Sequence, residues 1–300
     1  MKSALPVASE NSVSLLIRPN TLGVSAQGVR SFFWPRVVDI YRRVFGLLKK
    51  DPTLLILFAL ISLLDLTALL VLFLAPIAPV SYILAPIIRT FWSDYYLHYP
   101  QNFILLPKLF NHAHFLILAT FGILVNGLAV KKIENQLISG RKMSTLIAAG
   151  PAFKKYGALL TAWLLVYFLF TTSLKVVFRV LPRILSLHLG VMFGMTLLGQ
   201  AVAFFLLPSL LLSGKGFLGG LREGLKMGLR NLVLTCVLTA VPISTVVLLS
   251  FLRIFTPMYI QFYPELILWI LIVGSIAMAL ADLFLSASAT VLYLESRSHS

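Results

Sequence analysis

Six long apolar runs constrain this chain more than any other feature of its sequence. A helix needs about twenty predominantly apolar residues to cross the roughly 30 Å hydrocarbon core of a bilayer, because it advances about 1.5 Å per residue. The runs cover residues 53–74, 109–130, 157–174, 188–212, 232–252 and 266–292. We therefore predict an all-α fold, a polytopic transmembrane helical bundle of about six spans that pair as three hairpins.

The composition excludes a water-soluble fold of this size. Of the 300 residues, 59% are hydrophobic and 12% are charged, and the mean hydropathy is +0.95. Such a chain has too few polar side chains to cover a soluble domain. Residues 1–30 contain no apolar core of signal-peptide length, so we predict a disordered cytoplasmic leader there, a membrane domain over 31–294 and a cytoplasmic tail over 295–300.

The positions of the basic residues indicate an orientation in the membrane. The net charge is +15, and the Lys and Arg side chains lie beside apolar runs, which favours anionic lipid headgroups over nucleic acid as the partner. With the N-terminus inside, only six of the 25 basic residues fall outside, and this bias predicts that both termini are cytoplasmic. The six are Arg89, Lys108, Lys175, Arg179, Arg183 and Arg253. The three between 175 and 183 are alternatively expected to snorkel from the end of the third span.

A basic stretch with helical spacing precedes the first, third and fifth spans. This order indicates three copies of one unit, an interfacial helix followed by a span and a return span. The basic side chains are Arg42, Arg43, Lys49 and Lys50 in the first stretch, Lys154 and Lys155 in the second, and Arg222, Lys226 and Arg230 in the third. They either only orient the protein or form a collar that binds anionic lipid or phosphate, at about 1 kcal/mol for each exposed cation.

This alternation of basic juxtamembrane helices and paired spans resembles the membrane domain fused to some bacterial glycerophosphodiester phosphodiesterases, and the YciC-like inner-membrane proteins. The resemblance extends over residues 31–292 and rests on the pattern, not on a motif. It implies a bacterial inner-membrane location. It implies no hydrolase activity, because the His-Arg-Gly start of the phosphodiesterase active site occurs nowhere in this sequence.

Three polar residues inside the predicted spans are candidate functional residues: Asp65, Gln200 and Asp282. An ionised Asp at the centre of a span costs about 2.5 to 3.5 kcal/mol on insertion scales, so partners are expected. Counted from the predicted span ends, the three residues lie at similar depths and could meet in one layer. The layer is either hydrogen-bonded glue between helices or a proton or cation relay.

Several shorter patterns carry further expectations. The outer segment 77–88 is too short to span and is predicted to be interfacial or re-entrant. Asp94, His98, His112 and His114 form the one cluster that suggests metal chemistry, but interface histidines explain it, and we predict no metal site. Gly190 and Gly194 are predicted to allow close packing of helices. Pro242 is predicted to kink the fifth span, with Thr239, Ser244 and Thr245 bonding the freed backbone groups.

The sequence contains no Walker loop, dinucleotide fingerprint, HExxH or nucleophile elbow, so we predict no catalytic residues and no cofactor. The leading hypothesis is a non-enzymatic inner-membrane protein that contacts anionic lipid, a protein partner or a second copy of itself through its basic cytoplasmic face. The alternative is a small transporter or channel that uses the polar layer. A cavity that reaches the intramembrane Asp residues would favour the transporter, whereas a sealed layer would favour the scaffold.

Overall fold

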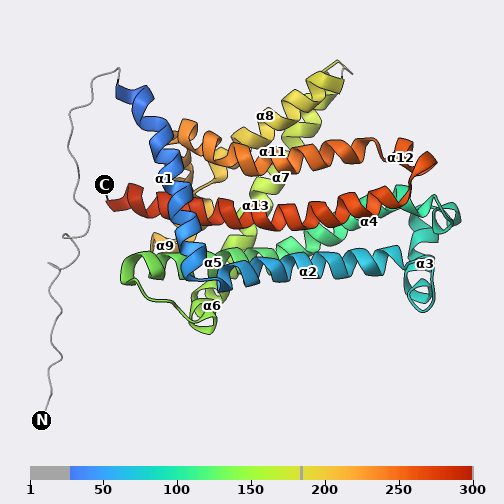
Figure 1. Ribbon diagram of the computed structural model, residues 1–300, viewed down its shortest axis with the longest axis horizontal. Helices are drawn as coiled ribbons and strands as arrows, with labels where there is room; N and C mark the ends of the chain where they lie inside the picture. Colours follow the sequence, from blue (N-terminus) through green and yellow to red (C-terminus); the bar gives the residue numbers. More distant parts are fainter. Residues whose placement is uncertain (1–27, 183–184, 299–300) are drawn as a thin grey trace, which may run out of the picture. The chain divides into compact units, whose positions relative to one another are not determined.

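The computed structural model describes residues 28–182 and 185–298 (Figure 1). Within these ranges every regular element is a helix, and six helices are long and apolar enough to cross a membrane. The prediction of an all-α bundle with six spans is therefore confirmed. The predicted leader lies outside the described residues, apart from residues 28–30 at the start of the first helix.

The helices follow one another as three successive units, each with one helix before two spans. The first unit contains α1 (Gly28–Lys50), α2 (Thr53–Phe73), α3 (Ser81–Phe91), η2 (Asp94–Leu97), α4 (Asn102–Ile117), η3 (Leu118–Gly122) and α5 (Ile123–Ser139). The second contains α6 (Thr145–Lys154), α7 (Tyr156–Val180), α8 (Leu185–Ala203) and α9 (Leu206–Leu212). The third contains α10 (Phe217–Arg230), α11 (Leu232–Ile254), α12 (Thr256–Phe262) and α13 (Glu265–Ser298).

The span boundaries differ from the predicted ones mainly at the polar ends. The second span is one helical stretch, Asn102–Ser139, because polar residues continue the helix beyond the apolar run. Helix α7 continues to Val180, so Lys175 and Arg179 lie in its last turns, as the snorkelling alternative expects. The fourth span is interrupted at Phe204 and Phe205, between α8 and α9.

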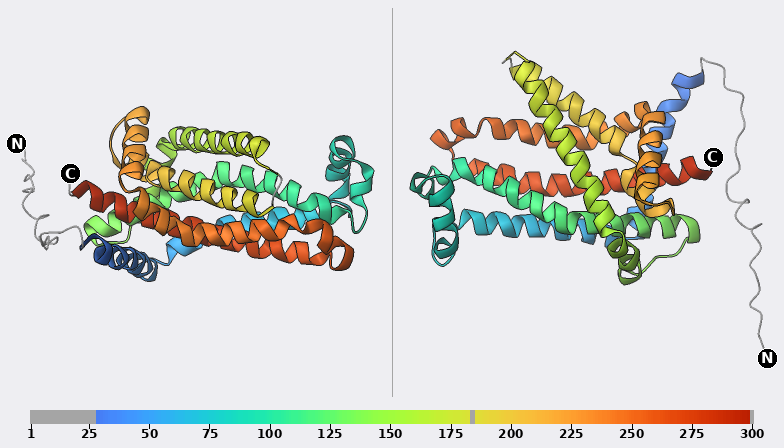
Figure 2. Two further views of the ribbon diagram at one scale, coloured as in Figure 1. Left: turned by 90° about the horizontal axis from the view of Figure 1, so that it is seen from above. Right: turned by 180° about the vertical axis from the view of Figure 1, so that it is seen from behind.

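Helix α13 is the centre of the packed bundle because one of its faces consists of small residues. Ser275, Ala279, Ser286 and Ala289 are all buried, so this face packs against helices and not against lipid. Its neighbours include α2, α5 and α11. Figures 1 and 2 show α2, α11 and α13 running alongside one another, while α7 and α8 leave them at an angle.

Helix α11 passes through Pro242 without a break. Proline lacks an N–H, so the carbonyl of Leu238, four residues earlier, loses its intrahelical donor. The hydroxyl of Tyr41 on α1 donates to this oxygen at 2.7 Å. The prediction that nearby hydroxyls serve the freed group is wrong at this oxygen, because Thr239 bonds the carbonyls of Thr235 and Cys236 instead. Helix α1 is thereby attached to the spans.

The glycines that allow close packing lie on α10. A Cβ on Gly228 would come within 2.4 Å of the Val202 carbonyl oxygen, and Gly220 and Gly224 also face α9 at short range. A Cβ on Gly190 or Gly194 would meet nothing within 4 Å, so the predicted close packing there is wrong. Helix α10 turns its glycine face to the bundle, which leaves its leucines partly or fully exposed and its basic stripe exposed.

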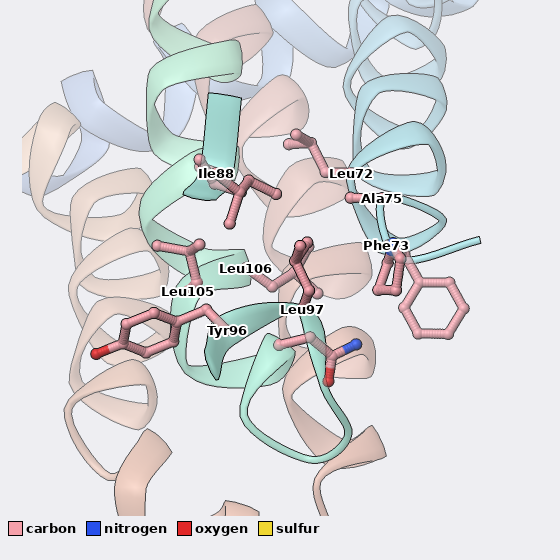
Figure 3. Close-up of a pocket in the computed structure, with 11 residues that line it drawn as sticks. Leu72, Phe73, Ala75, Ile88, Tyr96, Leu97, Leu105 and Leu106 are labelled. Carbon is pink, nitrogen blue, oxygen red and sulfur yellow. The ribbon is translucent and has the colours of Figure 1, made fainter. Parts of the chain in front are cut away.

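The segment between the first two spans closes the opposite end of the bundle. Residues 77–88, predicted to be interfacial or re-entrant, include most of the short helix α3, whose Ile88 packs with Ala75 and Leu105. A cavity of about 10 Å³ beside these residues has room for about one water molecule (Figure 3). The hydroxyl of Tyr99 donates to Glu265 at 3.0 Å and joins this segment to α13. This end therefore contains no cavity of ligand size at the α3 contact.

Candidate functional site

Asp65 is bonded on several sides within the bundle. It lies on α2 with a side chain that is 1% exposed, and His114 Nδ1 on α4 lies 2.9 Å from its Oδ2 and 3.0 Å from its Oδ1. Ser275 on α13 donates to Oδ2 at 3.3 Å. The His114 ring also stacks on Phe110. Asp65 therefore joins three helices through hydrogen bonds, as expected for a structural role.

Asp65 and Asp282 contact different parts of α13. Ser275, the partner of Asp65, precedes Asp282 by seven residues, which corresponds to roughly 10 Å of helix rise. The hydrogen bonds of Asp65 therefore lie about two turns from Asp282 along α13, and the single layer of three residues stays a prediction. Asp282 remains close enough to His114 and Asp65 for an electrostatic interaction with each.

Asp282 and Gln200 instead line a second cavity, of about 280 Å³, which we name the α7 cavity. It lies among η3, α5, α7, α8, α9 and α13, where α7 leaves the packed helices. Most of its lining side chains are apolar, including Leu159, Val166 and Leu285. The polar and aromatic lining residues are Asn126, Trp163, Tyr167, Phe170, Thr196, Gln200, Asp282 and Ser286.

A π-helical turn, η3, shapes one wall of the α7 cavity. Its wider winding displaces backbone carbonyls from their α-helical partners, and such turns are frequent at functional sites. The Ala119 carbonyl accepts from the Tyr156 hydroxyl at 3.0 Å, and the Gly122 carbonyl accepts from the Asn126 amide at 2.9 Å. Asn126 Oδ1 in turn accepts from the Ser286 hydroxyl on α13. The wall is therefore stabilised by side chains from three spans.

The carboxylate of Asp282 differs from that of Asp65 in having no bonded partner. No hydrogen bond or ion pair joins it, or the amide of Gln200, to another side chain in the part of the chain that the structure describes. The hydroxyl of Thr196, one turn before Gln200, donates to the Met192 carbonyl and keeps its lone pairs available. Asp282 and Gln200 are thus available to a molecule inside the cavity.

The basic segments gather at one end of the bundle, which we name the basic end. It contains the second half of α1, the end of α5, α6, α10 and the end of α13 (Figure 2). Arg43 pairs with Glu295 at 2.8 Å, and the Tyr293 hydroxyl donates to Glu223 at 2.8 Å. Arg297 donates to the Leu212 carbonyl at 2.8 Å. These contacts join the first and third basic segments through α13.

Most of the predicted lipid-facing cations are exposed at the basic end. The exposed side chains with no ion pair or hydrogen bond to other described residues are Arg42, Lys49, Lys50, Lys154, Arg222, Lys226 and Arg230. Arg43 is exposed as well, but Asp39 and Glu295 neutralise it. Lys155 departs from the prediction, because its ammonium donates to the Leu210 carbonyl at 2.6 Å at the end of α9. Burial, followed by repulsion from Lys131 and Lys154, lowers the pKa of Lys155.

One buried ion pair at the basic end was missed by the sequence reasoning. Lys132 Nζ lies 3.1 Å from Asp51 Oδ2, and both side chains are at most 3% exposed. Burial alone would raise the pKa of Asp51, but hydrogen bonds from Thr53 and Lys132 and the charge of Lys132 hold it below its ordinary value. In the sequence, Lys132 enters only the count of basic residues on the inner side of the membrane. The local signal was the Asp51-Pro52 helix start, which does not reveal a partner 81 positions away.

The four residues of the candidate metal cluster do not all converge in the structure, because only Asp94 and His98 of the four bond each other. Asp94 is bonded by Arg89 and by His98, His112 is exposed, and His114 belongs to the Asp65 pair. Within residues 28–182 and 185–298, no group of three or more His, Cys, Asp or Glu side chains could hold a metal ion. Sequence reasoning placed His114 at the membrane interface because the helix was expected to begin at residue 109, whereas it begins at Asn102.

Comparison with known proteins gives no match for this chain among family models, curated proteins or solved structures.

Proposed function

We propose that this multi-pass membrane protein is a small, non-enzymatic transporter whose substrate site is the α7 cavity. The observation that supports the proposal is a cavity of about 280 Å³ among the spans that reaches Asp282 and Gln200. Small-molecule sites are mainly apolar clefts with a few polar groups, and this volume lies near the lower end of their range of about 300 to 1,000 Å³. A scaffold would instead be expected to seal or pair its intramembrane carboxylate.

Labelling of a cysteine in the cavity tests this proposal. Cys236 is the only cysteine, so a Cys236→Ala background carries no other thiol. In reconstituted vesicles, Gln200→Cys should react with a membrane-impermeant maleimide from at least one aqueous side. Leu280→Cys is the matched control, because Leu280 is 45% exposed on the outer surface of α13 and should face lipid. A Gln200→Cys protein as unreactive as the control would refute the proposal.

A second candidate function is contact between the basic end and anionic lipid, as the sequence first suggested. It is supported by the exposed side chains of Arg42, Lys49, Lys50, Lys154, Arg222, Lys226 and Arg230. Each adds about 1 kcal/mol of attraction near an acidic leaflet, and the positive-inside rule would then make this end cytoplasmic in a bacterial inner membrane. The two functions are compatible, since they use different parts of the protein.

Nanodiscs of defined composition test the second candidate. Wild-type protein should unfold at a higher temperature in phosphatidylglycerol discs than in phosphatidylcholine discs. A variant with Lys49, Lys50, Arg222 and Lys226 replaced by Gln should lose most of that difference. A variant with Lys108→Gln, near the opposite end, should keep it. A full difference in the fourfold variant would contradict the assignment.

A further inference from the structure

The chemistry of the α7 cavity indicates which class of molecule it accepts. We propose that it binds a small molecule with an apolar body and one ammonium group, which interacts with Asp282. This inference rests on the proposed function, because it concerns the same cavity. It specifies a substrate class that the transporter proposal alone leaves open.

The first argument is the absence of a counter-ion. Asp282 has no ion pair within the described residues, and the only charged or titratable groups near enough to interact with it are His114 and Asp65, which bond each other. Lys155 lies beside the lining residue Leu210, but its ammonium donates to the Leu210 carbonyl. A carboxylate in a membrane interior is costly without a cation. A bound ammonium group would supply that charge.

The second argument is the aromatic wall on α7. Trp163 and Tyr167 both line the cavity, and their rings stack with centroids 5.6 Å apart. Phe115 on α4 contacts both rings. The face of an indole or phenol ring attracts a cation, and the attraction is largest where water is excluded. A carboxylate together with these rings favours an ammonium group over a neutral or anionic one.

The third argument is the apolar remainder of the lining. Apolar side chains, leucines above all, make up most of the lining. They would favour the burial of an apolar body, but they would leave most polar groups of a sugar or a phosphate without hydrogen-bond partners. Gln200 and Thr196 add hydrogen-bonding groups on the α8 side of the cavity. The lining therefore selects an amphipathic cation of small size.

Binding of two matched probes tests the inference. Benzyltrimethylammonium and its neutral carbon isostere, neopentylbenzene, have nearly the same shape. Calorimetric titration of the full chain in maltoside micelles should show that the cation binds at least about tenfold more tightly, the factor that corresponds to one cation–π or charge contact. Asp282→Asn should remove this preference. Asp94→Asn, which removes an exposed carboxylate at the other end, should leave it unchanged.

A second variant keeps the test decisive if Asp282→Asn does not fold. Trp163→Leu should weaken the cation about fivefold while it changes neopentylbenzene by less than about twofold. Equal affinity of the two probes for wild-type protein, or a preference that persists in a folded Asp282→Asn protein, would overturn the ammonium assignment. If the probes bind equally while Gln200→Cys is labelled, the proposal of a substrate site in the α7 cavity is retained and only the ammonium assignment is refuted. Unlabelled Gln200→Cys without binding of either probe would remove both proposals.

Discussion

The two intramembrane carboxylates of this protein occupy contrasting environments. Asp65 lies where α2, α4 and α13 pack closely, and it is bonded by His114 and Ser275. Asp282 lies on the same helix as Ser275 but faces the α7 cavity, where α7 and α8 diverge from the other spans, and it has no bonded partner in the described chain. The cost of burying a charge is offset at the first site and not at the second.

This contrast separates the two roles that an intramembrane Asp can have. A carboxylate whose acceptor positions are filled by neighbouring helices stabilises the fold, and its removal leaves those neighbours unsatisfied. A carboxylate without partners contributes little to packing but is available to a ligand. Residue type alone does not distinguish them, because both are aspartates in apolar runs with leucine and alanine nearby.

The largest effect is expected at the Asp65 pair. His114→Ala leaves a 1% exposed carboxylate with Ser275 as its remaining donor, and breaking such a buried pair costs about 3 to 5 kcal/mol. Asp282→Asn should change stability by less than about 1 kcal/mol, because no bond is lost. Reversible unfolding in mixed micelles measures both. Equal losses of stability in the two variants would contradict the contrast between Asp65 and Asp282.

The next largest loss of stability is expected at the buried ion pair of Asp51 and Lys132. Asp51→Asn should cost about 3 kcal/mol at pH 7, since the Lys132 ammonium would be left buried without a carboxylate. The pKa of Asp51 is below its ordinary value of 3.8 in the folded state, so its contribution is complete above that pH and is lost as the pH falls through the folded-state pKa. Unfolding from pH 7 to pH 2 should therefore show the two proteins converging in acid. A constant difference would contradict this assignment.

Two glycine substitutions compare a closely packed position, Gly228 on α10, with an open position, Gly194 on α8. Gly228→Ala should cost about 1 to 3 kcal/mol, because the new Cβ would overlap the Val202 carbonyl on α8. Gly194→Ala, further along α8, should change stability by less than about 0.5 kcal/mol, since its Cβ would meet nothing. Thermal unfolding of the two variants provides the measurement. A larger cost at Gly194 would show that α8 is packed closely there.

The smallest effect is expected from filling the cavity. Ala203 lines the α7 cavity near the end of α8, and Ala203→Leu should add about 1 kcal/mol of stability by occupying empty volume. The same change should abolish binding of benzyltrimethylammonium and protect Gln200→Cys from maleimide. Ala148→Leu is the contrasting variant, because Ala148 is fully buried and a larger side chain there should destabilise the protein. A destabilised Ala203→Leu protein would indicate that the cavity has no spare volume.

Much of the fold follows from the sequence, because crossing a membrane depends on local hydrophobicity. Apolar length determined the number of spans, and the position of Lys and Arg determined that the basic segments belong to one end. The small-residue face of α13 is also visible in the sequence, since Ser275 and Ser286 recur with alanines at helical spacing. Each of these properties is set by the residues of a single segment and does not depend on which helices lie next to it.

Only the tertiary structure decided which polar residues meet. The bond from Tyr41 to the Leu238 carbonyl, the pairing of Asp65 with His114 and the opening of the α7 cavity all depend on how neighbouring helices tilt and where they end. Hydropathy specifies neither the tilt of a helix nor its register, because a helix can be equally apolar at any tilt and in any register against its neighbours. The sequence by itself therefore determined that two aspartates lie among the spans, and the packing decided that one is bonded and the other is open to a ligand.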